Sequence, residues 1–222
     1  MMIAKNYTEY INPQQIAVGC SDQPLYALKK KIQWACSQQL SNQSYFAFMG
    51  GLHIEQAALK VHGELLQGTG LDDIVQHAGM ATVGLKTAVC EVNDIKKASY
   101  SVQVLASCLY KLLWNAYLES GGDNFDDWVK AQDSAMFKYW YGILDHQVTI
   151  LMLVRSFREA DLILFISTLK KIVPLFFALD HTHYSRWLPV FIQDLEVMTV
   201  ENHQLFRQFS FLFVHRFLNS PR

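Results

Sequence analysis

The chain has 222 residues, of which 51% are hydrophobic and 18% charged, a composition too apolar for a disordered protein. Its 19 Lys and Arg residues are balanced by 20 Asp and Glu residues, which gives a net charge of -1. This balance excludes a bulk electrostatic attraction to nucleic acid or to an anionic membrane, and the longest basic run, Lys29-Lys30-Lys31, is interpreted as a solvated face.

The cysteine pattern and the hydropathy indicate the cellular compartment. The four cysteines lie apart among apolar neighbours, without CxxC spacing, which is typical of reduced thiols in a core. The first residues lack the apolar segment of a signal peptide, and no apolar stretch reaches the roughly 20 residues that cross a bilayer. The sequence therefore predicts an intracellular protein, nuclear or cytoplasmic, with no membrane partner.

Two short apolar runs near the N-terminus have the character of buried strands. They are residues 15–20 and 45–49, and helical patterns follow each of them, over residues 25–34 and 54–67. Parallel strands need a helical crossover of this kind, so we predict that the two runs pair as neighbouring parallel strands.

Beyond Gly68 the pattern is almost continuously helical. The predicted helices cover residues 72–78, 93–118, 126–156, 160–179, 181–195 and 201–218, with breaks near Gly79, Gly84, Gly121-Gly122 and Pro174. The predicted fold class is therefore mostly α: one domain over residues 1–222, with a small α/β unit of two short strands (1–67) and a helical bundle (68–222).

A first polar cluster joins the second predicted strand to its helix, in the sequence Gly50-Gly51-Leu52-His53-Ile54-Glu55. Such a junction can project polar side chains into a cleft beyond the strand ends, where Asp22 and His53 should approach each other. The glycines lack the spacing of a phosphate-binding loop. In the alternative interpretation, Glu55 favours the positive end of the helix dipole and His53 is a structural residue.

A second polar cluster lies in residues 179–187, the densest polar and aromatic run of the chain. Asp180 can cap the following helix, and His183 and Arg186 share a helix face. His181 and His183 form an HxH pair, but the cysteines or HExxH pattern that would strengthen a zinc interpretation are absent. A metal site and a network of caps and packing contacts both remain open. Three aromatic residues of this region are predicted to be buried anchors: Phe177, Tyr184 and Trp187.

Several blocks of sequence carry a family resemblance. They are residues 22–27 with 32–34, 50–60, 66–70, 137–140, 154–156 and 173–190. In these blocks the chain resembles a group of transposon-derived animal proteins that are associated with mobile genetic elements. The resemblance extends from about residue 22 to about residue 194.

The resemblance implies an RNase H-like transposase plan, a partial core with a large helical insertion. In that plan, acidic residues at strand ends hold two divalent cations, and here Asp22, Glu55 and Asp180 would take this catalytic and metal-binding role. Carboxylates suit Mg²⁺ or Mn²⁺, and the reaction would be phosphodiester hydrolysis or transfer.

The chain also departs from that group. It lacks an Asp-Gln-Thr-His-Glu type of segment and a sizeable region before Asp22, so we expect a fragment or reduced copy that binds nucleic acid weakly and lacks full activity. The leading hypothesis is a transposon-derived protein related to DNA-processing proteins. The alternative is a non-enzymatic helical module with protein partners, in which the polar clusters are structural. Convergence of Asp22, Glu55 and Asp180 would favour the first hypothesis, and their dispersal the second.

Overall fold

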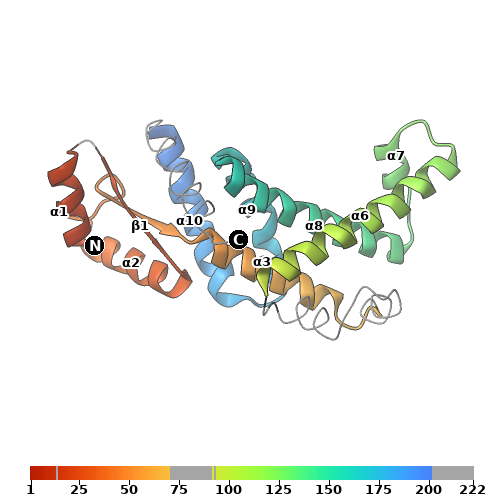
Figure 1. Ribbon diagram of the computed structural model, residues 1–222, viewed down its shortest axis with the longest axis horizontal. Coiled ribbons are helices and arrows are strands. Elements are labelled where there is room, and N and C mark those ends of the chain that lie inside the picture. Colours follow the sequence, from red (N-terminus) through yellow and green to blue (C-terminus); the bar gives the residue numbers. More distant parts are fainter. Residues whose placement is uncertain (14, 71–91, 93, 202–222) are drawn as a thin grey trace. The chain divides into compact units, whose positions relative to one another are not determined.

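A computed structural model describes residues 1–13, 15–70, 92 and 94–201 of the chain (Figure 1). These residues are mostly helical, with a two-stranded parallel sheet near the N-terminus, which confirms the predicted fold class. The chain divides into two units, Met1–Glu55 with Leu153–Arg222, and Gln56–Met152. The RNase H-like plan and the single domain with a boundary near residue 67 stay predictions.

The first unit contains the predicted strand-helix-strand arrangement. Strand β1 (Ala17–Ser21) and strand β2 (Tyr45–Met49) pair in parallel, with Ala17 opposite Tyr45 and Ser21 opposite Met49. Helix α2 (Gln23–Ala35) connects them. All five residues of β2 are buried, as expected for a continuous apolar run in a parallel sheet.

The glycine pair after β2 allows close packing. The Gly50 N–H donates a hydrogen bond to the Ser21 carbonyl at 2.7 Å, which ties together the carboxyl ends of the two strands. At Gly51, where helix α3 (Gly51–Leu66) begins, an added Cβ would lie 2.4 Å from the ring of Phe157. A side chain at Gly51 would force the Phe157 ring to move, so the glycine at this position has a packing cause.

Two long helices complete the core of the first unit. Helix α9 (Leu162–Ala178) packs along helix α10 (Thr182–Glu201). The Phe48 ring of β2 contacts Phe165 of α9 and Phe191 of α10, with centroids 6.2 and 5.1 Å apart. This aromatic cluster joins the sheet to both helices.

The predicted helix break at Pro174 is wrong, because α9 continues through this residue. A proline removes one backbone hydrogen bond from a helix, and the extensive buried face of α9 offsets that loss. Of the three predicted aromatic anchors, Trp187 is buried and Tyr184 is partly buried, but Phe177 is 61% exposed. The neighbouring Phe176 occupies the inward position of the helix instead.

The second unit consists of most of α3 with helices α6 (Ile95–Ser120), α7 (Phe125–Lys130) and α8 (Ala135–Glu159), the last as far as Met152. Gly121, with φ of 67°, ends α6 in the left-handed conformation that favours glycine. The predicted helix over residues 126–156 is divided in two. Its break lies at residues 131–134, where the Ser134 hydroxyl accepts a hydrogen bond from the Phe137 N–H and α8 begins.

Other findings differ from the sequence predictions or lie beyond their test. Helix α1 (Met2–Ile11) was not predicted, and it buries no residue. Cys20, Cys36 and Cys108 are exposed, so the prediction that they lie in the core is wrong.

Some predictions lie outside the described residues. These are the helix at 72–78, the breaks at Gly79 and Gly84, and all but the first residue of the helix at 201–218. In the described part of the chain, no helix has the length and apolar character needed to cross a membrane.

Candidate functional site

The two predicted polar clusters meet at the carboxyl edge of the sheet. Tyr184, from the second cluster, donates its hydroxyl hydrogen bond to the carbonyl of His53, in the first cluster, at 3.1 Å. Burial, with the negative charge of Asp22 added, raises the pKa of Tyr184 to about 12. The hydroxyl therefore stays protonated as a donor, and Asp22, His53 and Tyr184 share one region.

The three predicted metal-binding acids have distinct surroundings. The Asp22 carboxylate accepts a hydrogen bond from the Leu25 N–H at 3.2 Å and caps α2. Glu55 is buried in the first turns of α3. Asp180 has a left-handed backbone, with φ of 55°, in the turn between α9 and α10. Among the described residues no group of three or more His, Cys, Asp or Glu side chains is placed to hold a metal ion, and the implied roles stay predictions.

The other residues of the second cluster shape the start of α10. The His181 N–H donates a hydrogen bond to the Phe176 carbonyl at 2.9 Å, and the two rings lie with centroids 5.6 Å apart. His183 and Arg186 are exposed on the first turns of the helix. These contacts agree with a turn stabilised by capping and packing.

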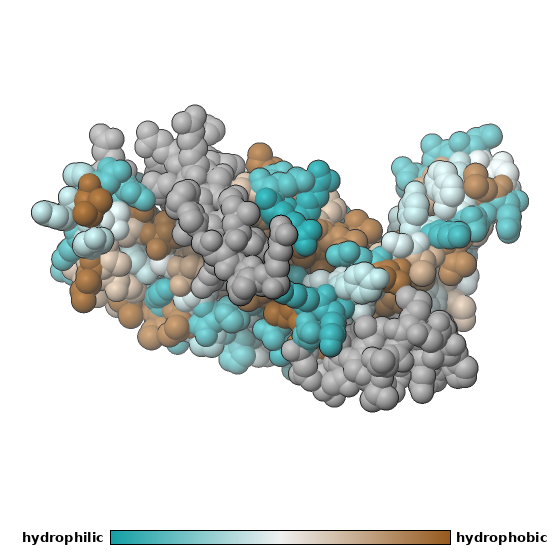
Figure 2. All heavy atoms as spheres, in the orientation of Figure 1, coloured by the Kyte–Doolittle hydropathy of each residue, from teal (hydrophilic) through white to brown (hydrophobic). Residues whose placement is uncertain are grey.

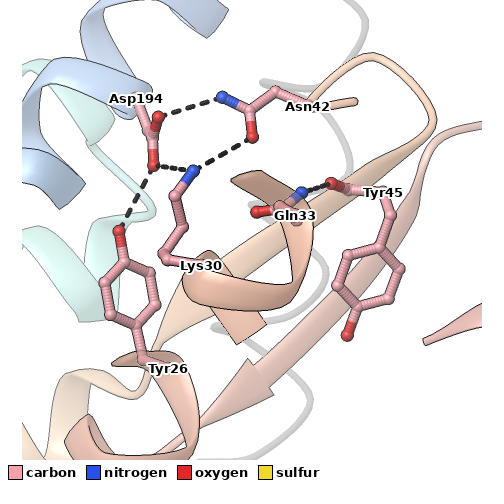
Figure 3. A network of polar contacts seen from close by, with 6 residues as sticks. All are labelled: Tyr26, Lys30, Gln33, Asn42, Tyr45 and Asp194. Carbon is pink, nitrogen blue, oxygen red and sulfur yellow. Dashed lines mark hydrogen bonds and ion pairs between the residues drawn. The ribbon is translucent and has the colours of Figure 1, made fainter. Parts of the chain in front are cut away.

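A buried polar network that the sequence did not reveal links α2 to α10 (Figure 3). The Lys30 ammonium lies 2.8 Å from one oxygen of Asp194, and the Tyr26 hydroxyl donates to the same oxygen at 3.2 Å. Asn42 donates to the other oxygen at 2.9 Å and accepts from Lys30 at 3.3 Å. Lys30 is 2% exposed, so the basic run is not a uniformly solvated face.

This network stabilises the packing of α2 and the segment before β2 against α10. Burial, and then the charge and hydrogen bond of Asp194, raise the pKa of Tyr26 far above its ordinary value, so the hydroxyl remains a donor. The carboxylate of Asp194 is shared among Tyr26, Lys30 and Asn42, from α2 and from the segment before β2. Only the tertiary structure could reveal this network, because Asp194 lies more than 150 residues from its partners in the sequence.

The second unit contains a buried histidine pair. His62 of α3 and His146 of α8 lie with ring centroids 5.7 Å apart, and Gln147 Nε2 is 3.3 Å from His62 Nε2. Burial lowers the pKa of His62 to about 3 and that of His146 to about 4. Both rings are therefore neutral at physiological pH.

The second unit also contains a connected set of aromatic rings that are exposed or partly exposed. They lie in residues 107–141, which we name the aromatic hairpin. It comprises the end of α6, all of α7 and the start of α8, and none of its residues is buried. Neighbouring rings lie 5.3 to 6.1 Å apart by centroid. The rings in this series are Tyr110, Trp114, Tyr117, Phe125, Trp128, Phe137 and Tyr141.

The aromatic hairpin is also acidic. It carries five acidic residues against three lysines. Two of the lysines are already engaged, since Lys130 lies 4.0 Å from Asp127 and Lys138 lies 3.1 Å from Asp133. The hairpin therefore presents aromatic rings together with an excess of negative charge.

These features define a mostly helical protein with a small parallel α/β unit. The sequence pattern of a domain of unknown function, DUF8702, matches residues 80–217, more than half of the chain, and the chain belongs to this family. The matched range includes the whole aromatic hairpin. Comparisons with curated proteins and with solved structures find no match.

Proposed function

We propose that this chain is a non-enzymatic protein-interaction module that binds a basic segment of a partner protein through the aromatic hairpin. The observation that carries the proposal is the connected series of rings in a stretch where no residue is buried. Contiguous exposed apolar surface is characteristic of interaction sites, and Trp and Tyr contribute disproportionately to binding energy.

The charge of the hairpin favours a basic partner. Lys and Arg side chains bind to the faces of Trp and Tyr rings by cation–π attraction, and nearby carboxylates strengthen the same contact. Glu119 and Asp123 flank the end of α6, close in sequence to Trp114 and Tyr117. A phosphate backbone would meet unfavourable charge here, so the surface supports a protein partner over nucleic acid.

The surroundings of the predicted acids are consistent with this proposal. Asp22 is engaged as a helix cap, and Asp180 forms a tight turn in which its carbonyl accepts a hydrogen bond from the Thr182 N–H at 2.8 Å. Glu55 is buried in the first turns of α3. Asp22 and Asp180 thus take part in a helix cap and a turn, which are structural roles.

The test uses a short synthetic peptide of alternating arginine and leucine, with a counterpart in which glutamate replaces arginine. We expect the intact chain to bind the arginine peptide, and Trp114→Ala to weaken binding at least about tenfold, the loss of about 1.4 kcal/mol. Isothermal titration calorimetry measures both affinities. Leu112→Ala is the matched control, since Leu112 is 67% exposed on the same helix but outside the ring series.

Two results would overturn the proposal. One is equal affinity for the arginine and glutamate peptides. The other is an equal loss of affinity in Leu112→Ala and Trp114→Ala, which would show that the rings do not form the binding surface.

The second candidate function is a transposon-derived, metal-dependent phosphodiester nuclease or transferase. The observation that favours it is the position of Asp22 at the carboxyl end of β1, in the same region as His53 and Tyr184. Asp22→Asn provides a clean test, because asparagine caps a helix as well as aspartate does but lacks the charge that attracts a cation. Calorimetric binding of Mn²⁺ that disappears in Asp22→Asn would support this candidate, and absence of binding in the unchanged chain would refute it.

A further inference from the structure

Helix α2 has its two faces reversed relative to an ordinary amphipathic helix. Its buried residues are Gln23, Tyr26, Lys30 and Gln33, three of which are polar or charged without an aromatic ring. Its outward side carries Leu25, Leu28 and Ile32, which are 53%, 52% and 38% exposed. A helix at the surface of a soluble unit normally buries such a stripe and exposes the polar one.

The reversed orientation is fixed by specific bonds. Lys30 is held by Asp194 and Asn42, and the Gln33 side-chain amide donates a hydrogen bond to the Tyr45 carbonyl at 2.7 Å. Turning the helix to bury its leucines would leave these polar groups without partners, which costs more than the apolar contacts would return. The outward stripe is therefore a property of the folded unit.

The spacing of the outward residues indicates the shape of a partner. Leu25, Leu28 and Ile32 stand at positions i, i+3 and i+7, which form one line along a helix and match the apolar face of a second helix. In the space-filling view, brown hydrophobic atoms lie at the surface in the part of the picture that α1 and α2 occupy in Figure 1 (Figure 2). The three side chains thus form a stripe that a helix can cover.

The charge of α2 indicates the charge that a partner helix should carry. The segment contains three lysines and no acidic residue. Lys30 is neutralised by Asp194, and Lys29, which is partly exposed, donates a hydrogen bond to the Gly19 carbonyl at 3.1 Å. Lys31 is therefore the exposed lysine next to the stripe. A second copy of α2 would bring lysines against lysines, while a helix with carboxylates beside its apolar face would complement them.

We infer that the outward face of α2 is a docking site for an acidic amphipathic helix of a partner protein. Leucine-like side chains of the partner cover Leu25, Leu28 and Ile32, and its Glu or Asp residues pair with Lys31. This site lies in the first unit and has the opposite charge preference to the aromatic hairpin, so neither proposal depends on the other.

The test uses a fluorescent synthetic helix with leucine at positions i, i+3 and i+7 and glutamate on its other faces, together with a counterpart that carries lysine in place of glutamate. Fluorescence anisotropy with the full chain carrying Trp114→Ala measures binding of each, because this replacement weakens binding of basic peptides at the aromatic hairpin. We expect the glutamate helix to bind and the lysine helix to bind at least tenfold more weakly. Leu28→Ser should weaken binding of the glutamate helix at least tenfold, and Lys31→Glu should shift the preference toward the lysine helix.

Ile163→Ser is the matched control, because Ile163 is a 72% exposed aliphatic residue on α9 and its replacement should leave binding unchanged. Circular dichroism of every variant should match the unchanged chain, since the replaced side chains are exposed. The inference is overturned if the glutamate helix does not bind, or if Leu28→Ser binds it as tightly as the unchanged chain. It is also overturned if Leu28→Ser instead abolishes a dimer seen by sedimentation, or binding to phosphatidylserine vesicles, because the occupant would then be a second copy or a lipid surface.

Discussion

At the scale of single residues, two aromatic side chains on adjacent helices differ sharply in burial. Trp187 is 8% exposed and packs against Tyr26 with ring centroids 6.2 Å apart, whereas Phe177 is 61% exposed. We expect Trp187→Ala to lower the free energy of unfolding by about 3 to 5 kcal/mol, the usual loss for a large buried aromatic residue. Chemical denaturation measures this loss of unfolding free energy. Phe177→Ala should change stability by less than about 0.5 kcal/mol, and comparable losses in the two variants would contradict the assignment.

The glycine positions make a second residue-scale prediction with an internal control. An alanine at Gly51 would place its Cβ 2.4 Å from the Phe157 ring, so Gly51→Ala should destabilise the chain by about 1 to 3 kcal/mol. At Gly142, inside α8, an added Cβ meets no atom within 4 Å. Gly142→Ala should therefore stabilise the chain by about 0.5 to 1 kcal/mol, because alanine loses less backbone entropy in a helix. Thermal melting that moves in the same direction for both variants would refute the packing explanation.

At the scale of elements, the buried ion pair between Lys30 of α2 and Asp194 of α10 holds these two helices together. Asp194→Ala leaves the ammonium of Lys30, which is 2% exposed, without its carboxylate, and we expect a loss of about 3 to 5 kcal/mol. Lys30→Met alone should cost less, since Asp194 is then still bonded to Tyr26 and Asn42.

The double variant Lys30→Met with Asp194→Leu tests the same prediction. Because both charges are removed together, it should recover much of the stability lost in Asp194→Ala. Urea unfolding of the unchanged chain, Lys30→Met, Asp194→Leu and the double variant gives the coupling free energy. Strictly additive losses would mean that Lys30 and Asp194 do not interact in solution.

At the scale of the whole molecule, the histidine pair makes stability depend on pH. In the unfolded chain a histidine binds a proton near pH 6.5, but in the fold His62 does so only at about 3 and His146 at about 4. Below pH 6.5 the unfolded state therefore holds more protons, so stability is greatest above this pH and falls as the solution becomes more acidic. The slope is at most about 1.4 kcal/mol per pH unit for each histidine, down to about pH 4.

Replacing one member of the pair should flatten that dependence. We expect His146→Leu to reduce the slope of unfolding free energy against pH between 6.5 and 5 by about the contribution of one proton. His183→Leu is the control, since His183 is exposed and its replacement should leave the slope unchanged. Parallel curves for all three proteins would show that His146 is not held neutral by burial.

The sequence by itself determined the features that rest on local pattern. Continuous apolar runs followed by helical spacing predicted the parallel pair of β1 and β2, and the polar residues between apolar stretches predicted most helix boundaries within a few residues. The reason is that strand pairing through a helical crossover, and capping by Asp22, Asn124 or Asp161, depend on neighbours in the chain.

The tertiary structure decided what depends on distant partners. Lys30 belongs to a run that resembles a solvated face, and only Asp194, far along the chain, makes its burial favourable. The same bonds turn Leu25, Leu28 and Ile32 outward, against the expectation from their spacing. Amphipathic pattern predicts that a helix has an apolar side, but which side faces the core is set by the sum of contacts from other elements, and a buried charged network can outweigh three leucine-sized side chains.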